Sequence, residues 1–442
     1  MGGILVLGAG RSSRFLLEYL SAFCESTGRN LTICDASEPG IHQHTKGLLA
    51  QTRVANLADE NTLNSLIPGN EIVVSLLPPP MHPVVATLCL KWNVHFASAS
   101  YVSDSMRSLH SEARAKGLTF LNELGLDPGI DHLSAMQAMD KIRVNGGIIH
   151  SFESYCGGLI HEDDCTENPW KYKFSWNPRN VVLAGQGGYS TFLMDGILRT
   201  LPWHRVFDEA TTLEIPDLGG FDAYANRDSL SYTETYGLSG LKTMIRGTIR
   251  RKDYCKNWQV LVGLGYTDGQ QLLPSSINSI GALSSALSGK RSNQSMVDWL
   301  IASKTIDSSQ ANWFRFLELD DLTPLVAEPK TAADLLELIL MQKWQLQPQD
   351  RDEVLMYHRI GYHENGVSKV LHSVMRVVGE DATRTAMAKT VGLPLALGVE
   401  AIVSGTCQEF GVVVPVSSFW YGAVLPKLEG YGITFSETVQ IL

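Results

Sequence analysis

The chain lacks the features that mark several classes of protein. Its 442 residues carry a formal net charge of -10 and contain no cluster of basic residues, which argues against binding to nucleic acid or to an acidic membrane surface. The seven cysteines include no Cys-x-x-Cys pair, so neither a zinc site nor a disulfide framework is predicted. The histidines show no metal-ligand spacing. The sequence therefore predicts no metal site, and reduced thiols predict a cytoplasmic location.

Long apolar segments and repeats are also missing. The N-terminus itself reads as a β-strand, so we expect no signal peptide, and no apolar run looks long enough to cross a bilayer. There is no internal repeat and no low-complexity segment. A hydrophobic content of 44% and a charged content of 19% are ordinary for a globular chain. The length predicts two or three domains.

The sequence does contain a dinucleotide-binding pattern at its N-terminus. An apolar run at 4–7 predicts a buried parallel strand, and Gly8-Ala9-Gly10-Arg11-Ser12-Ser13 follows it directly. A helical pattern comes next, and a second strand at 31–34 ends on Asp35. The first glycine permits a tight turn, the second lets the backbone approach a pyrophosphate, and the helix N-terminus attracts phosphate. We therefore predict a site for a nicotinamide dinucleotide.

Further cofactor contacts are expected at the ends of other strands. A fourth strand at 71–77 runs into three prolines, and ligands in such sheets lie beyond the carboxyl ends of the strands. Asp35 is expected to hold the ribose hydroxyls and to repel a 2′-phosphate, so NAD is expected to be preferred to NADP. Ser37 offers the alternative, since it could bind a phosphate if Asp35 turned away. The predicted cofactor-binding residues are Gly8, Gly10, Arg11, Ser12, Ser13, Asp35, Leu77 and Pro78.

A second pattern is more specific than the first. The segment Gly125-Leu126-Asp127-Pro128-Gly129-Ile130-Asp131-His132 resembles the signature of glutamate-forming saccharopine dehydrogenases, also called saccharopine reductases. Blocks similar to that family follow in order at 151–159, 168–176, 226–229, 246–248 and 390–394. They span most of the chain. The segment 269–349 and the loop after Asp35 match the family least well.

The resemblance implies an α/β fold, in which a Rossmann-type dinucleotide-binding domain carries an inserted mixed α/β substrate domain and a smaller helical lobe. The expected boundaries are 1–127 plus part of 390–442 for the Rossmann domain, 128–268 and 350–389 for the substrate domain, and 269–349 for the lobe. Local patterns agree with this. Residues 148–156 alternate like a strand, Asn365-Gly366 suits a hairpin turn, and 380–387 and 394–402 read as helices. The family also suggests a homodimer.

The resemblance implies a reaction as well. Saccharopine is a small amino-acid derivative with a secondary amine, which such enzymes oxidise with NAD or NADP. Hydrolysis of the resulting imine gives L-glutamate and 2-aminoadipate 6-semialdehyde. The family pattern places Asp127, Cys156 and Tyr101 at the reacting centre. Asp127 is either an acid–base group or a hydrogen-bond partner of the amine, and it could also cap the following helix. Cys156 is equally well explained as a buried core residue.

The carboxylates of such a substrate call for arginine and hydroxyl groups, because a planar guanidinium binds a carboxylate through two hydrogen bonds. Arg227 is the best candidate, with an ion pair to Asp222 or Asp228 as the alternative. The predicted substrate-binding residues are Ser100, Gly157, Trp176, Arg227 and Thr248.

Two other functions stay open. One is the same fold acting on another imine-forming substrate, as in carboxynorspermidine or carboxyspermidine dehydrogenases and lysine 6-dehydrogenase. The other is a nucleotide-binding regulatory protein without turnover. The Cys-Gly-Gly and Asn-Arg-Asp-Ser blocks favour a substrate with several carboxylates over the first alternative, and the presence of Asp127 and Arg227 argues against the second.

Overall fold

The computed structural model describes residues 2–226, 228–291, 293–326 and 328–442. They form two compact units. The first unit contains the described residues of Met1–Ile148, Glu364–Val367 and Met375–Glu437. The second contains those of Ile149–His363, Ser368–Val374 and Thr438–Leu442. The three-part division expected from the sequence stays a prediction.

The first unit has the predicted Rossmann-type fold. Its seven strands lie in the order β15-β6-β5-β4-β1-β2-β3, and all neighbouring pairs are parallel. The strands are β1 (Gly3–Leu7), β2 (Asn30–Asp35), β3 (Gln51–Val54), β4 (Asn70–Ser75), β5 (His95–Ala97), β6 (Thr119–Leu121) and β15 (Gly411–Val413). The chain order reverses between β1 and β4, and ligands bind at such a switch point, beyond the carboxyl ends of the strands.

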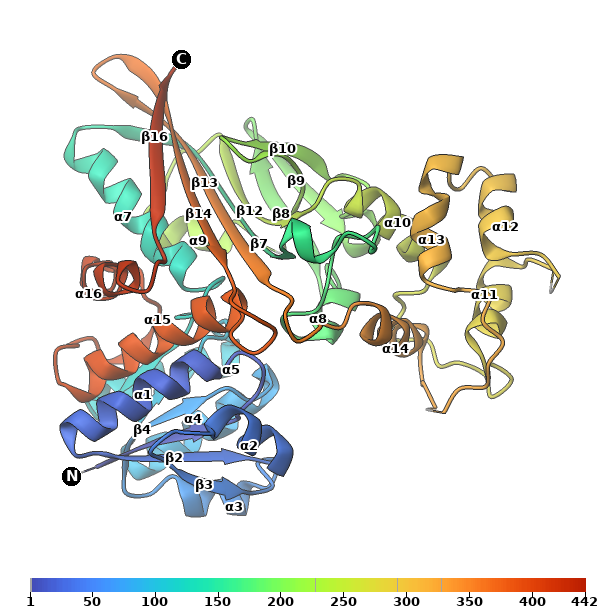
Figure 1. Ribbon diagram of the computed structural model, residues 1–442. Coiled ribbons are helices and arrows are strands. Elements are labelled where there is room, and N and C mark those ends of the chain that lie inside the picture. The colour runs from blue at the N-terminus through green and yellow to red at the C-terminus, as the bar shows by residue number, and fades with distance from the viewer. Residues whose placement is uncertain (1, 227, 292, 327) are drawn as a thin grey trace. The chain divides into compact units, whose positions relative to one another are not determined.

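Helices cover both faces of this sheet (Figure 1). Leu5, Leu7 and Val73 point to one face and pack in a core with Val85 and Leu88 of α4. On the opposite face α1 and α15 pack against each other. The helices of the unit are α1 (Arg14–Thr27), α2 (Glu38–Thr45), α3 (Glu60–Leu66), α4 (His82–Trp92), α5 (Asp104–Arg107), α6 (His110–Ala115), α7 (Ile130–Val144), α15 (Ala386–Val403) and α16 (Ser418–Glu429).

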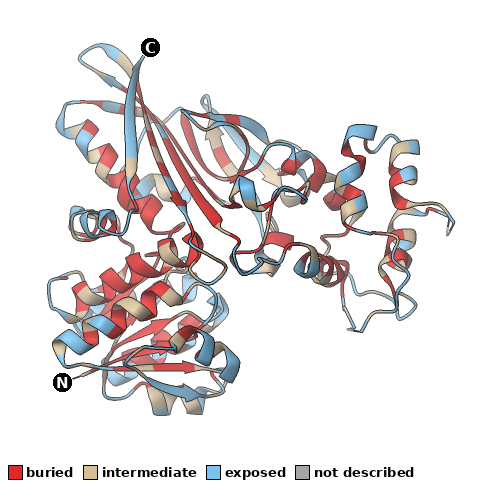
Figure 2. Ribbon diagram, viewed as in Figure 1, coloured by how far each residue is buried: buried red, intermediate tan, exposed pale blue. Residues whose placement is uncertain are grey.

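Helix α15 corrects two expectations from the sequence. The helix expected at 394–402 begins earlier, at Ala386, and continues through Pro394, whereas residues 380–385 of the other expected helix are not helical. Within the described part of the chain, it is the one helix long and apolar enough to cross a membrane, so the expectation that no run reaches this length was wrong. Its most apolar window is 78% buried inside the protein, and most of the helix has the colour of buried residues in Figure 2. Packing against α1, β4 and β5 accounts for its apolar composition.

The second unit is built on a nine-stranded sheet. Its main path runs β10-β11-β12-β7-β13-β14-β16, and β8 pairs with β12 and with β9. The strands are β7 (Ile148–Ile160), β8 (Tyr189–Met194), β9 (Ile197–Pro202), β10 (Thr211–Ile215), β11 (Gly219–Ala225), β12 (Thr243–Arg250), β13 (Asp352–Glu364), β14 (Val367–Val378) and β16 (Phe435–Ile441). Asn365 and Gly366 join β13 to β14, and both have positive φ angles. The predicted hairpin turn is thus confirmed.

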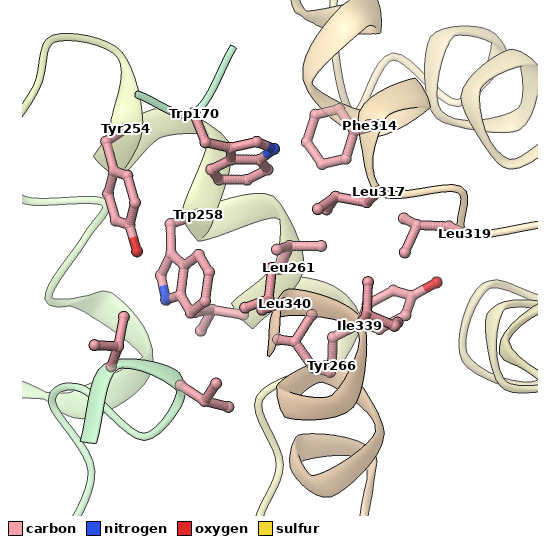
Figure 3. Close-up of a cluster of buried hydrophobic side chains, with 14 of the residues drawn as sticks. Trp170, Tyr254, Trp258, Leu261, Tyr266, Phe314, Leu317, Leu319, Ile339 and Leu340 are labelled. Atoms are coloured by element: carbon pink, nitrogen blue, oxygen red, sulfur yellow. The ribbon is translucent and has the colours of Figure 1, made fainter. Parts of the chain in front are cut away.

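An aromatic core lies beside this sheet. Trp170, Tyr254, Trp258 and Trp344 are almost fully buried and pack ring against ring, as Figure 3 shows for the first three of them. The helices of the unit are α8 (Pro178–Val182), α9 (Ser231–Thr235), α10 (Tyr254–Leu264), α11 (Ile280–Ser288), α12 (Met296–Ala302), α13 (Ala311–Phe316) and α14 (Ala332–Lys343). The region expected to be helical, 269–349, accordingly contains α11 to α14.

Candidate functional site

The glycine turn after β1 has the shape that a dinucleotide requires. Gly8 has a φ of 101°, which favours glycine, and a Cβ there would lie 3.2 Å from the Leu76 carbonyl oxygen. The turn therefore packs against the loop after β4, which continues into Leu77 and Pro78. A Cβ at Gly10 would meet no atom within 4 Å, so open space lies where the motif expects a pyrophosphate.

The first turn of α1 completes this cradle. The Ser13 hydroxyl donates to the Gly10 carbonyl oxygen at 2.7 Å, so the serine that replaces the third glycine of the motif stabilises the turn. No side chain caps α1 at Ser13, which leaves the helix N-terminus available to an anion. Arg11 is exposed and Ser12 half-buried beside it. These residues fit a bound dinucleotide.

Asp35 has an additional task that the sequence does not reveal. Its Oδ2 accepts a hydrogen bond from the Ala9 backbone N–H at 2.7 Å, and its Oδ1 accepts one from the Ser37 N–H at 2.7 Å. The carboxylate thus ties the glycine turn to the end of β2. Two N–H donors also reduce the effective negative charge that Asp35 presents to a ligand.

In the first unit, two of the predicted catalytic residues lie in contact. The Tyr101 hydroxyl donates to Asp127 Oδ1 at 2.8 Å. Tyr101 follows β5 and Asp127 follows β6, so both lie beyond the carboxyl ends of neighbouring parallel strands. Asp127 is not a helix cap, because α7 begins at Ile130 with Gly129 in the cap position. Ser100, half-buried, precedes Tyr101.

Sequence reasoning missed a buried pair that supports these loops. Glu123 Oε1 accepts a hydrogen bond from the N–H of Val102 at 2.8 Å, and its Oε2 lies 3.0 Å from His132 Nε2. The Glu123 backbone N–H donates to the Ser100 carbonyl oxygen at 3.1 Å. The chain on both sides of Tyr101 is therefore held to the strand end that leads to Asp127. His132 thus takes part in a buried structural contact with Glu123.

In the second unit, three predicted residues lie on neighbouring strands. Cys156 of β7 and Thr248 of β12 are register partners in a parallel pair, so the structure brings them together. Gly157 has a packing reason to be glycine, since a Cβ there would lie 2.5 Å from the Ile249 carbonyl oxygen. Trp176 donates its indole N–H to the Tyr172 hydroxyl at 3.0 Å.

Arg227 lies outside the described residues, so its role stays a prediction. Its block is held to β12 on both sides. The Asn226 N–H donates to the Arg246 carbonyl oxygen at 2.8 Å, and the Ser229 hydroxyl accepts from the Arg246 N–H at 2.9 Å. Within the described ranges, no group of three or more histidine, cysteine or acidic residues is arranged to hold a metal ion.

His82, which begins α4, gives the first unit a testable dependence on pH. Burial lowers the pKa of His82 from its ordinary value near 6.5 to about 4, because the charged imidazole loses its hydration. Below pH 6.5 the unfolded chain binds the proton more readily than the folded chain. The free energy of unfolding should therefore fall by on the order of 3 kcal/mol as the pH drops from 6.5 to 4.

The measurement is urea denaturation at several pH values, with two variants. His82→Gln removes the titrating group and should reduce the acid-induced loss of stability. His42→Gln is the control, because the His42 side chain is 75% exposed. Equal pH dependence in both variants would contradict the assignment. Burial also lowers the pKa values of His44 and His95, so part of the acid lability should persist in His82→Gln.

A parallel sheet with this glycine turn, a fitting helix N-terminus and polar groups beyond its strands defines a Rossmann-type nucleotide-binding protein. Residues 4–121 match the family model described as the saccharopine dehydrogenase NADP binding domain, and residues 125–433 match that of the saccharopine dehydrogenase C-terminal domain. The chain belongs to the saccharopine dehydrogenase family, which confirms the resemblance seen in the sequence.

Several relatives are similar along the whole chain. The α-aminoadipic semialdehyde synthase of Rattus norvegicus is 31% identical over 99% of this chain and 48% of its own length; the chain thus spans about half of the first curated relatives. Saccharopine dehydrogenase [NADP(+), L-glutamate-forming] of Pyricularia oryzae is 29% identical over 99% of this chain and 98% of its own. The structure of apo saccharopine dehydrogenase (L-Glu forming) from Saccharomyces cerevisiae covers 100% of both chains, with 28% identity and a TM-score of 0.88.

Proposed function

We propose that this protein oxidises the secondary amine of saccharopine and releases L-glutamate and 2-aminoadipate 6-semialdehyde. The observation that carries the proposal is the Tyr101–Asp127 hydrogen bond of 2.8 Å beyond the strand ends of the nucleotide-binding unit. Asp127 lies in the block that resembles glutamate-forming saccharopine dehydrogenases, and the family pattern places Tyr101 at the same reacting centre. Relatives with that activity in their names align over almost their entire length, which supports the same assignment.

A bound nicotinamide dinucleotide would accept the hydride from the carbon beside the amine. The glycine turn and the start of α1 are the candidates to bind its phosphates. In the proposed reaction, Asp127 accepts a hydrogen bond from the substrate amine, and Tyr101 keeps the Asp127 side chain in place. Cys156, Gly157, Trp176, Thr248 and Arg227 are proposed to contact the substrate. No covalent intermediate with Cys156 is needed, since the carbon–nitrogen bond is broken by water after oxidation.

The experiment is a cofactor absorbance assay. Purified protein with saccharopine and NADP should produce reduced cofactor, and glutamate should appear in equal amount. Absence of both products under conditions in which the protein binds NADP would refute the proposal. A cytoplasmic location and a homodimer stay predictions.

We further propose NADP as the preferred cofactor. The preference for NAD expected from Asp35 finds no support among the relatives: the matching model is that of an NADP binding domain, and three fungal relatives are named for NADP(+). The hydrogen bonds from Ala9 and Ser37 offer a physical reason, because each oxygen of Asp35 already accepts one backbone N–H and has less capacity left for ribose hydroxyls. Ser37, the N-cap of α2, is the candidate to meet the 2′-phosphate.

We expect kcat/KM to be at least about tenfold higher with NADP than with NAD. A tenfold ratio corresponds to a free-energy difference of about 1.4 kcal/mol. Ser37→Ala should lower kcat/KM for NADP and leave that for NAD within twofold. Ser26→Ala serves as the control, since the Ser26 hydroxyl is exposed and donates to the Phe23 carbonyl oxygen within α1. A wild-type preference for NAD would restore the ribose-binding assignment of Asp35.

A further inference from the structure

The loop that carries Ser100 and Tyr101 contacts a buried histidine to which the proposed reaction gives no role. His82 is 4% exposed. Its Nδ1 lies 2.9 Å from the hydroxyl of Ser75, the last residue of β4. Its Nε2 lies 2.9 Å from the Ser100 hydroxyl and 3.3 Å from the Ser98 hydroxyl. The imidazole therefore connects the end of β4 to the loop that follows β5.

This imidazole is neutral at the pH of a cell. Burial lowers the pKa of His82 to about 4, and the ring packs edge-on against Phe96 with 6.1 Å between the ring centroids. A neutral imidazole carries one N–H donor and one acceptor nitrogen. In either tautomer it can hydrogen-bond a hydroxyl at each end. The imidazole of His82 therefore acts on the loop through directional hydrogen bonds and not through a charge.

The backbone of Ser100 is already fixed by its neighbours. The Ser100 N–H donates to the Ser98 hydroxyl at 3.1 Å, and the Ser100 carbonyl oxygen accepts from the Glu123 N–H at 3.1 Å. These two bonds fix the backbone of Ser100 but leave its side chain free to rotate. A half-buried serine without a partner samples three staggered rotamers, and the contact with His82 Nε2 selects one of them.

We propose that His82 is a positioning residue for substrate binding, which holds the Ser100 hydroxyl in one rotamer so that a substrate carboxylate meets a preoriented hydrogen-bond partner. The proposal rests on the proposed function, in which Ser100 contacts the amino-acid substrate. Preorientation matters because a group that is ordered before binding costs less entropy when the ligand arrives.

Two substitutions at His82 separate positioning from a merely structural role. An asparagine amide reaches about as far as Nδ1. His82→Asn can therefore still hydrogen-bond Ser75 but no longer reaches Ser100. A glutamine amide reaches about as far as Nε2, so His82→Gln can still hydrogen-bond the Ser100 hydroxyl. We expect His82→Asn to raise the saccharopine KM by about five- to tenfold, the effect of one hydrogen bond, with the NADP KM unchanged. His82→Gln should stay within twofold of the wild type.

A double variant tests whether His82 acts through Ser100. Ser100→Ala should raise the saccharopine KM to a similar extent, and His82→Asn combined with Ser100→Ala should add nothing further. Effects that multiply would overturn the proposal, as would a wild-type KM in His82→Asn. Circular dichroism and thermal unfolding establish that each variant is folded.

A readout without turnover keeps this proposal separate from the proposed function. If the wild type does not oxidise saccharopine, the proposed function fails on its own. The contact itself is then followed by nitrogen-15 NMR of the His82 ring. Ser100→Ala should shift the Nε2 resonance more than the Nδ1 resonance, and Ser75→Ala should do the reverse. Resonances that stay unchanged in both variants would overturn the positioning role.

Discussion

Gly129→Ala is expected to abolish the folded arrangement around Asp127. Gly129 has a φ of 143°, and a Cβ there would lie 2.1 Å from the backbone nitrogen of Gly125 and 2.2 Å from its carbonyl oxygen. Backbone atoms cannot move aside as a flexible side chain can, and the Gly125 N–H and carbonyl are already hydrogen-bonded to Pro128 and Ile130. The free energy of unfolding should fall by about 4 kcal/mol, near the upper end for a single substitution, because the clash adds to the strain of a positive φ.

Gly146→Ala is the matched control for this prediction. Gly146 also has a positive φ, of 77°, but a Cβ there would meet no atom within 4 Å. Gly146→Ala should lower the free energy of unfolding by about 1–2 kcal/mol, because alanine is strained in a left-handed backbone conformation. Urea denaturation followed by circular dichroism measures both variants. A similar loss in the two would show that the contact between Gly129 and Gly125 does not determine the stability of this loop.

Gly10→Val is expected to remove cofactor binding while the protein stays folded. A Cβ at Gly10 meets no atom within 4 Å, so the new side chain starts in open space. It does fill the place where the motif brings a pyrophosphate against the backbone. The Kd for NADP should rise more than about 100-fold, equal to about 2.7 kcal/mol.

Gly422→Ala is the control for the cofactor prediction. Gly422 lies in the middle of α16, and a Cβ there also meets no atom within 4 Å. NADP binding should be unchanged, and the helix should gain slightly in stability because alanine is the better helix former. Titration calorimetry measures the Kd of each variant. Near wild-type NADP affinity in Gly10→Val would remove the glycine turn from the cofactor site.

Much of the first unit could be predicted from local patterns. The strand, glycine turn, helix and Asp35 occur in the order that the dinucleotide-binding unit requires. The resemblance to the family implied that Tyr101 and Asp127 lie at one centre, and the structure adds the reason, since the loops that carry them follow neighbouring parallel strands. Asn365-Gly366 predicted its hairpin because few other residue pairs adopt two positive φ angles.

Other features depend on contacts between distant segments, which no local pattern encodes. Gly392 illustrates this, since a Cβ there would lie 2.9 Å from the Leu16 backbone nitrogen; its lack of a side chain lets α15 approach the start of α1. The hydrogen bonds of Asp35 to Ala9 and Ser37 arise from loop geometry. The preference for NAD was predicted from Asp35 without these bonds. The role of His82 depends on serines from two different strand ends.

Oxidation of saccharopine by this protein is tested most directly by a comparison of two substrates. Purified wild-type protein is given NADP with saccharopine or with carboxynorspermidine, and reduced cofactor, glutamate and semialdehyde are quantified. We predict that saccharopine yields all three products in equal amounts and that carboxynorspermidine yields little reduced cofactor. Robust turnover of carboxynorspermidine with none of saccharopine would contradict the account.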